Sequence, residues 1–293
     1  VLDDIAMANW HNDAPIAGLQ HVGHHQMMTR ARELGVTVIL SGQGADEILL
    51  GYLKFLGFHL QSLVKQKRPL KAATTLGRFA LNRSIVNQIE LGAASRYVPL
   101  LRRFGDRDAD RNTEGPMLEG WQPIPLGLGS STLAERQWRD VRSLSVPSLC
   151  HYEDRMSMAL GREIRLPFLD FRLVDFLLRA PDDYKIGRGW TKLALRHAVE
   201  PILPPEIVWR KDKAGFANPQ GEWLKHELRA PILEAFQSDG PLAQRGIIDS
   251  PAMIRRYQRY CEQPVNGGII WAREIFAPLS LHVWMDQFGQ WID

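Results

Sequence analysis

A glycine-rich turn followed at once by two carboxylates, in the sequence SGQGADE, occupies residues 41–47. Glycines let the backbone approach a ligand closely, and the free N–H groups at the start of a helix attract anions. Asp46 and Glu47 would repel such an anion unless a divalent metal ion lay between them. The stretch therefore indicates a phosphate site with a bridging metal. An ordinary strand–turn–helix junction explains the same residues about equally well, because short glycine motifs match by chance.

Charged residues gather before a proline turn in residues 152–170, which read YEDRMSMALGREIRLPFLD. Arg155 lies on a predicted helix, whereas Glu163 and Arg165 stand where that helix gives way to the turn at Pro167. Side chains at the ends of elements beside a rigid turn can point into a cleft. Without other evidence, we favour a solvated helix end with local ion pairs, each of which stabilises little.

A basic run, WRKDKAGFANP, occupies residues 209–219 and ends in asparagine and proline. Lys213 lies at its centre, and an ammonium group is a strong point charge for holding a polyphosphate or stabilising a leaving group. A solvated basic turn is the commoner explanation of such a run.

Histidine and cysteine give weaker signals of a metal site. His21, His24 and His25 share one face of a predicted helix, but no HExxH motif or cysteine partner accompanies them. A surface or packed helix face is therefore favoured over zinc binding. Cys150 and Cys261 are far apart and form no CxxC, so neither a disulfide framework nor thiolate-bound zinc is expected.

The elements that must position these groups are mostly helices. The β-branched run at residues 36–40 predicts a buried strand leading into the glycine-rich turn, and apolar spacing predicts one helix over residues 45–66. A further helix is expected over residues 147–160, and Thr191 is expected to cap the helix that follows it. Residues 102–131 are rich in charge, glycine and proline, so we expect a flexible connection there.

The fold class that follows is α/β and predominantly helical. Only one strand is evident, and because a parallel sheet needs neighbouring strands, we expect its partners upstream of Val1. The chain opens without an initiator methionine, which suggests a fragment of a longer protein.

The composition argues against several classes of protein. The 293 residues are 45% hydrophobic and 24% charged, which is typical of a soluble domain. A formal net charge of +3 gives no reason to expect nucleic-acid binding. No apolar run reaches membrane-spanning length and no signal-peptide pattern opens the chain, so we expect a cytoplasmic protein with no membrane partner.

In this order, the three stretches resemble the blocks of one family, the glutamine-hydrolysing asparagine synthetases. SGQGADEILLGY is similar to the family's SGxGADE…GY motif, and DRMSMALGREIRLPFLD to its DRxSM…GxExRxPFLD block. TKLALRHAVEPILPPEIVWRKDKAGF resembles its TKxxLRxA…LPxxxxxRxKxGF block. The resemblance runs over residues 12–225 and identifies residues 1–293 as the C-terminal part of the synthetase domain.

The resemblance implies a partial adenine-nucleotide alpha-hydrolase-like domain of the PP-loop ATP pyrophosphatase type, with ATP and Mg²⁺ as cofactors. Such enzymes adenylate a carboxylate, classically that of aspartate. Ammonia from glutamine then gives asparagine, AMP and pyrophosphate. The implied partners are these small molecules and an N-terminal glutaminase domain, and a homodimer is a further candidate assembly.

The resemblance also implies roles for single residues. Asp46 matches the metal ligand, and Lys213 and Glu163 match catalytic positions. The other implied roles are binding of ATP or pyrophosphate by Ser41, Gly42, Gly44, Arg155 and Lys213, and binding of the substrate by Gln43, Glu47 and Arg165.

Two departures from the family pattern limit these expectations. The family's ATP loop, SGGxDS, does not occur in the chain, and neither does the glutaminase domain. We therefore expect the 293 residues alone to form no acyl-adenylate, and ATP–pyrophosphate exchange by them would refute this.

Gln43 stands where known asparagine synthetases carry an acid and a β-lactam-forming relative carries tyrosine, and an amide cannot act as a general base. The alternatives are an amidotransferase or cyclase of the same fold acting on a β-lactam precursor, a peptide or a glycan, and a non-catalytic assembly module.

Overall fold

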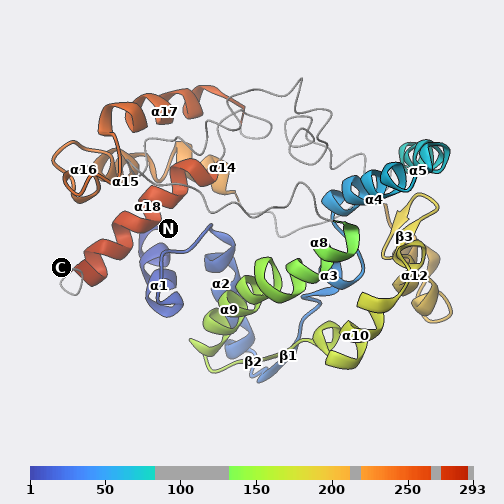
Figure 1. The fold of residues 1–293 in the computed structure, drawn as a ribbon. Coiled ribbons are helices and arrows are strands. Elements are labelled where there is room, and N and C mark those ends of the chain that lie inside the picture. Colours follow the sequence, from blue (N-terminus) through green and yellow to red (C-terminus); the bar gives the residue numbers. More distant parts are fainter. Residues whose placement is uncertain (83–131, 212–218, 265–271, 290–293) are drawn as a thin grey trace.

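The computed structural model describes residues 1–82, 132–211, 219–264 and 272–289. Helices dominate it and the strands are short (Figure 1). The α-helices are α1 (Leu2–Asn12), α2 (Gln20–Glu33), α3 (Ala45–Ile48), α4 (Leu53–Lys65), α5 (Pro69–Asn82), α8 (Leu133–Arg139), α9 (Val146–Met158), α10 (Phe171–Arg179), α11 (Asp182–Lys185), α12 (Leu193–Val199), α13 (Pro205–Val208), α14 (Gln220–Lys225), α15 (Arg229–Ala235), α16 (Pro241–Gln244), α17 (Ser250–Glu262) and α18 (Ala272–Phe288). The other elements are the π-helix η4 (Asp140–Leu144), the 3₁₀ helix η5 (Pro167–Leu169), and the strands β1 (Val38–Leu40), β2 (Glu163–Arg165), β3 (Ile186–Gly187) and β4 (Trp190–Thr191).

Strands β1 and β2 form a short parallel sheet. Val38 lies opposite Glu163 and Leu40 lies opposite Arg165, and the pairing continues where Ser41 N donates to Arg165 O (2.9 Å). The predominantly helical α/β class is thus confirmed. The expectation that the partners of β1 all lie upstream of Val1 is wrong, because β2 comes from the stretch expected to be a helix end and a turn.

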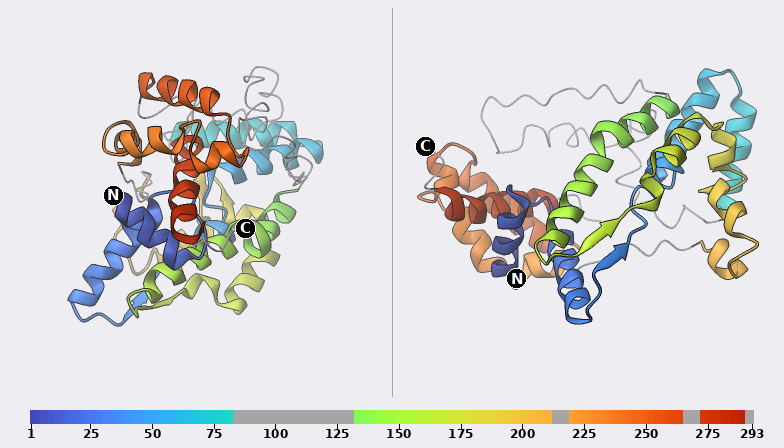
Figure 2. Two further views of the ribbon diagram at one scale, coloured as in Figure 1. Left: turned by 90° about the vertical axis from the view of Figure 1, so that its left-hand side faces the viewer. Right: turned by 90° about the horizontal axis from the view of Figure 1, so that it is seen from below.

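The largest apolar core joins the two ends of the chain. It holds side chains of α1, α2, α9 and α14–α18, and α1 lies against α18 (Figures 1 and 2). Asn9 crosses this interface, because its Nδ2 donates to Ser280 O (2.9 Å) and its Oδ1 accepts from Ser280 Oγ (3.1 Å). This packing anchors α9, which reaches from the core toward the glycine-rich turn.

Two smaller cores lie nearer to the turn. One packs Leu50 with side chains of α4 and α5, and with Leu133 and Ile186. The other packs α3 against α10 through Ile48 and Leu177. The turn is therefore bounded by packed helices.

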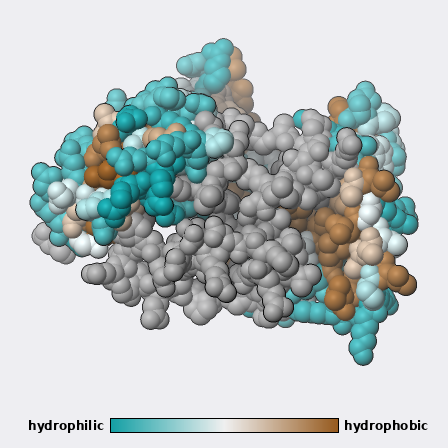
Figure 3. Space-filling view, turned by 90° about the horizontal axis from the view of Figure 1, so that it is seen from above, coloured by the Kyte–Doolittle hydropathy of each residue, from teal (hydrophilic) through white to brown (hydrophobic). Residues whose placement is uncertain are grey.

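Apolar side chains also gather on the surface at the end of the molecule that carries α4, α5 and α12 (Figure 3).

The single helix expected over residues 45–66 is in fact two. α3 ends at Ile48 and α4 begins at Leu53. Between them, Leu50 adopts a left-handed backbone conformation (φ 57°), and Gly51 N turns back to donate to Asp46 O (2.8 Å). Tertiary contacts have thus overridden an apolar spacing that continues across the break.

The expected cap of α12 is also wrong. Thr191 belongs to strand β4, and the capping position is held by Lys192, which has a left-handed backbone (φ 54°). The backbone N–H of Lys192 donates to Leu49 O (3.2 Å), so the start of α12 is tied to the end of α3. This contact brings Lys192 beside the glycine-rich turn.

The connection expected to be flexible, residues 102–131, lies outside the described residues. None of the helices in the described part of the chain combines the length and the apolar character needed to cross a bilayer.

Candidate functional site

The glycine-rich turn has the backbone that its sequence predicts. Gly44 has φ 88° and directly precedes α3, a conformation that residues with a Cβ rarely adopt. A Cβ at this position would also lie 2.2 Å from Leu169 Cδ2 in η5. Conformation and space therefore both require glycine here.

We expect Gly44→Ala to lower the free energy of unfolding by roughly 1–3 kcal/mol, because the alanine would adopt a left-handed backbone and clash with Leu169. Urea denaturation measures the loss. Gly42→Ala is the matched control, since a Cβ there would meet nothing within 4 Å. Equal stability of the two variants would contradict this account of the turn.

Asp46 follows the turn and forms an ion pair that the sequence does not reveal. Its Oδ1 lies 3.0 Å from Lys192 Nζ, and both side chains are partly exposed. Gly51 makes room for the pair, because a Cβ there would lie 1.9 Å from Asp46 Oδ1 and 2.6 Å from Lys192 Cε. A carboxylate and an ammonium group thus meet at one point beside the turn.

The pair lies at the wall of a cavity of about 430 Å³. Part of the wall is apolar and is formed by Phe168, Leu195, Val199, Leu203, Ile207 and Val208. The charged part is formed by Asp46, Lys192, Arg196, Arg210 and Lys211. A cavity with one apolar wall and several cations suits a ligand that combines a flat apolar group with a polyanion.

Arg196 holds this wall together. Its Nε donates to Thr191 O (3.0 Å), a second guanidinium nitrogen donates to Val208 O, and the guanidinium carbon lies 4.5 Å from the centre of the Trp190 ring. The contact joins β4 to α13. The basic run continues into residues 212–218. Those residues include Lys213 and lie outside the described part of the chain.

On its other side, the turn contacts α9. Ser41 Oγ donates to Glu153 Oε1 (2.6 Å), and Gln43 Nε2 donates to Tyr152 Oη (3.4 Å). Burial raises the pKa of the Glu153 carboxyl, and the hydrogen bond from Ser41 opposes that shift. A buried carboxylate thus faces the turn from a helix.

Sequence reasoning did not select Glu153 or Lys192. Glu153 shares a helix face with Met156 and Ser157, which are also buried, so an acid on an apolar face was the available signal. No signal in the sequence pointed to Lys192, because its partner Asp46 lies far earlier in the chain.

Several residues implied by the resemblance lie elsewhere. Glu47 is fully buried and accepts hydrogen bonds from Tyr52 Oη (2.9 Å) and Ser145 Oγ (2.6 Å). Glu163 and Arg165 form an exposed ion pair with each other on β2 (2.8 Å). None of these implied residues lines the cavity, whereas Asp46 does.

Arg155 also lies outside the cavity lining. Its guanidinium forms an exposed ion pair with Asp13 (2.7 Å), in the segment after α1. The structure therefore brings Ser41 and Gln43 to α9, and Asp46 to α12, but does not bring Arg155 to either group.

No group of three or more histidine, cysteine, aspartate or glutamate side chains comes together as a metal cage within the described residues. His21 and His24 pack around Tyr152, with ring centres 4.5 and 6.2 Å from it, and burial lowers the pKa of both imidazoles.

Comparison with known proteins agrees with the three sequence blocks. The asparagine synthase family model matches residues 1–286. Asparagine synthetase [glutamine-hydrolyzing] 1 of Bacillus subtilis is 24% identical over 97% of this chain and 45% of its own length. Asparagine synthetase [glutamine-hydrolyzing] 3 of the same organism is 28% identical over 64% of the chain and 29% of its own length.

A vertebrate relative agrees over a shorter stretch. The glutamine-hydrolysing asparagine synthetase of Gallus gallus is 38% identical over 41% of the chain and 22% of its own length. The chain spans less than half the length of these relatives. Because the family model covers nearly all of its residues, this chain belongs to the asparagine synthase family.

Proposed function

We propose that this chain forms the synthetase part of an enzyme that amidates a carboxylate through an acyl-adenylate. The leading substrate is aspartate, with ammonia derived from glutamine, and the products are asparagine, AMP and pyrophosphate. One observation carries the proposal: the Asp46–Lys192 pair beside a glycine-rich turn, at the wall of a partly apolar cavity.

The donor set at the turn fits Mg²⁺ bound together with ATP. Mg²⁺ is commonly held by one or two carboxylates, with phosphate oxygens and water completing its shell. Asp46 supplies one such carboxylate, and the space that Gly51 leaves keeps it at the cavity wall. Mg²⁺ would there neutralise phosphate charge.

Other residues of the chain bind and orient the nucleotide. The backbone of Ser41, Gly42 and Gly44 offers a close approach for phosphate. Lys192 provides an ammonium group for the departing pyrophosphate, and we propose that Lys213 provides a second. The apolar wall of the cavity excludes water from the nucleotide.

The reaction has two steps. A carboxylate oxygen of the substrate attacks the α-phosphorus of ATP, and the bond from that phosphorus to pyrophosphate breaks. Ammonia then attacks the acyl carbon, AMP leaves with the former carboxylate oxygen, and the nitrogen loses a proton. Adenylation makes this displacement feasible, since AMP is a better leaving group than an oxide.

Glu153 is our candidate acceptor for that proton. Gln43, at the centre of the turn, cannot accept it because an amide is not a base at neutral pH. The carboxylate of Glu153 adjoins the turn through Ser41, at 2.6 Å. Burial raises the pKa of this carboxyl, which makes Glu153 a stronger base than an exposed glutamate.

A second function is favoured by Gln43 itself. Its amide donates to Tyr152 and so presents a neutral side chain at the position where known asparagine synthetases carry an acid. An amidotransferase or cyclase of the same fold, acting on a β-lactam precursor, a peptide or a glycan, is therefore the alternative.

The test uses the full-length protein with ATP, glutamine and a panel of carboxylates, and measures release of AMP. Aspartate is expected to give the fastest release. If aspartate gives no AMP above background while another carboxylate does, the alternative replaces the leading function. If no carboxylate gives AMP, amidation through an adenylate is wrong.

A further inference from the structure

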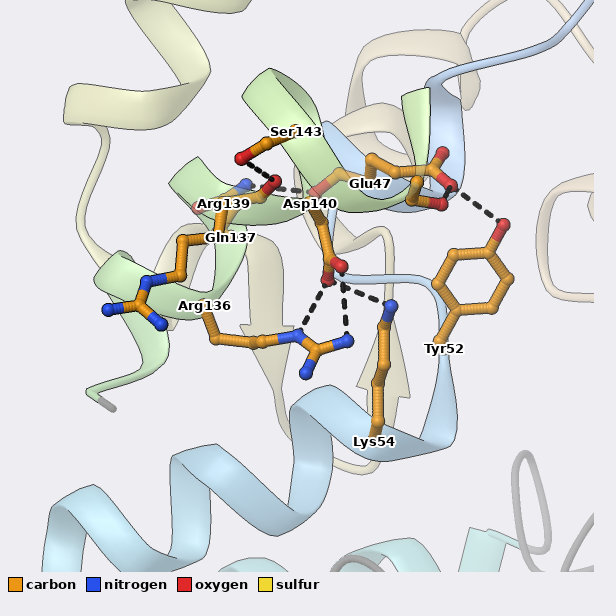
Figure 4. Close-up of polar contacts among 9 residues, drawn as sticks. Glu47, Tyr52, Lys54, Arg136, Gln137, Arg139, Asp140 and Ser143 are labelled. Carbon is orange, nitrogen blue, oxygen red and sulfur yellow. Dashed lines mark hydrogen bonds and ion pairs between the residues drawn. The ribbon is translucent and has the colours of Figure 1, made fainter. Parts of the chain in front are cut away.

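Helix α8 contacts α3 through one buried amide. Gln137 is fully buried, and its Nε2 donates to Glu47 O at the end of α3 (3.2 Å, Figure 4). It also donates to the next backbone carbonyl, Ile48 O (2.6 Å). These carbonyls belong to the last turn of a helix, where no backbone N–H of the same helix is available to donate to them. Gln137 therefore completes the C-terminal end of α3.

A buried lysine fixes the orientation of this amide. Lys185 is 1% exposed, and its Nζ donates to Gln137 Oε1 (2.8 Å) and to Leu177 O (2.9 Å). An ammonium group can only donate, so the oxygen of Gln137 must face Lys185. The NH₂ group must then face the carbonyls of α3, and the two contacts define one chain of hydrogen bonds.

The helical segment that continues α8 makes a second contact with α3. Ser145 Oγ donates to Glu47 Oε1 (2.6 Å). In an uninterrupted α-helix, Ser145 would point about 80° away from Gln137, at about 100° per residue. The π-helix η4, closed by Ser145 N donating to Asp140 O (3.0 Å), adds one residue to a turn and brings Ser145 to within about 20° of Gln137.

The π-helix is itself anchored to the element that follows α3. Asp140 is fully buried and pairs with Lys54 Nζ of α4 (2.8 Å) and with Arg136 Nε (3.1 Å) (Figure 4). Breaking such a buried pair leaves an uncompensated charge, so the arrangement is held firmly. α8 and η4 thus form a fixed support beside α3 and α4.

α3 needs this support because it has only four residues. A helix so short has no stability of its own in water. Asp46 is its second residue, and Gly51 N donates to Asp46 O at its end (2.8 Å). The place of the Asp46 carboxylate therefore depends on what holds the carbonyls of Glu47 and Ile48.

We propose that Gln137 is a positioning residue for Asp46. Lys185 orients the Gln137 amide, and Ser145 holds α3 independently through Glu47. The inference rests on the proposed function in one respect, that Asp46 binds the Mg²⁺ of the nucleotide. Gln137 does not touch the ligand. It fixes the backbone from which the carboxylate projects, as outer residues do for metal ligands.

The test compares Gln137→Glu with the wild-type full-length protein. Glutamate keeps an acceptor for Lys185 but cannot donate to the carbonyls of α3, so the two halves of the contact are separated. We expect the Mg²⁺ concentration for half-maximal AMP release to rise about tenfold. We also expect faster hydrogen–deuterium exchange of the amides in residues 44–51. Gln258→Glu, on the exposed side of α17, is the matched control and should change neither quantity.

Ser145→Ala is the second variant, for the case that Gln137→Glu does not fold. It removes one of the two hydrogen bonds to Glu47 and leaves that from Tyr52, so a smaller shift in the same direction is expected. An unchanged Mg²⁺ requirement in the folded variants overturns the inference. A lower rate without a change in the Mg²⁺ requirement would mean only that Gln137 has a general structural role.

Failure of the proposed function is separable from failure of the inference. If the wild-type protein releases no AMP at any Mg²⁺ concentration, the proposed function is wrong. The exchange rates of residues 44–51 then decide alone whether Gln137 holds α3. Equal rates in Gln137→Glu and the wild type reject that role.

Discussion

Asp46→Asn is expected to lower the rate of AMP release at least about 100-fold while leaving the protein folded. Asparagine has nearly the same shape as aspartate, so its amide oxygen can still face Lys192 Nζ, which lies 3.0 Å from Oδ1 of the carboxylate. The substitution removes the negative charge with which, in the proposed function, Asp46 binds Mg²⁺. Steady-state rates over a Mg²⁺ titration measure the effect.

The matched control for this variant is Asp175→Asn. Asp175 is an exposed aspartate of α10 whose partner is Arg179, and it lies outside the cavity lining. Its loss should leave the rate unchanged. If Asp46→Asn stays within about threefold of the wild type at every Mg²⁺ concentration, Asp46 is not the metal ligand.

Glu153→Gln is expected to separate activity from stability. The rate of AMP release should fall about 100-fold, the size of effect expected when a general base is lost. The amide oxygen of glutamine still accepts from Ser41 Oγ, so the hydrogen bond to the turn survives. The buried charge disappears, and the variant should therefore be at least as stable as the wild type at neutral pH.

The sign of the pH dependence follows from the raised pKa of Glu153. Burial favours the neutral carboxyl in the folded state, so its contribution to stability is fully present below about pH 4.3, the ordinary pKa of glutamate. That contribution is lost as the pH rises through the higher folded-state pKa. The stability of Glu153→Gln relative to the wild type should therefore increase with pH.

Urea denaturation between pH 4 and pH 8 measures this difference in the free energy of unfolding. Glu227→Gln, at an exposed glutamate of the same chain, is the control and should show no such trend. A variant that is less stable than the wild type at pH 7, or equally active, would contradict the role given to Glu153.

The sequence predicts the turn well because the turn depends on local residues. Gly44 needs a left-handed backbone, and Asp46 is the second residue of the short helix that begins directly after it. Strand β1 was also expected, since a β-branched run before a glycine turn is a local signal. The prediction that this strand is buried is wrong, because Val38 and Leu40 are exposed. The helix α9 lies close to its predicted range for the same reason.

The rest of the site depends on contacts between segments far apart in the sequence. Lys192 reaches Asp46, Glu153 reaches Ser41, and nothing in the spacing of either pair links its members. β2 escaped prediction because its three residues, Glu163–Arg165, carry two exposed charges and become a strand only by pairing with β1.

The break after α3 has the same origin. The apolar spacing of residues 45–66 continues without interruption, but Gln137 and Lys192 bind the carbonyls at the end of α3. Partners that arrive from other elements thus end the helix earlier than its own sequence indicates.

Transfer of ¹⁸O tests the central claim most directly. The full-length protein is given aspartate labelled with ¹⁸O in its side-chain carboxylate, together with ATP, glutamine and Mg²⁺, and the AMP is analysed by mass spectrometry. An acyl-adenylate requires that one labelled oxygen leave with AMP, so AMP carrying one ¹⁸O is the predicted result. AMP without label, or label in inorganic phosphate with release of ADP, would contradict the account.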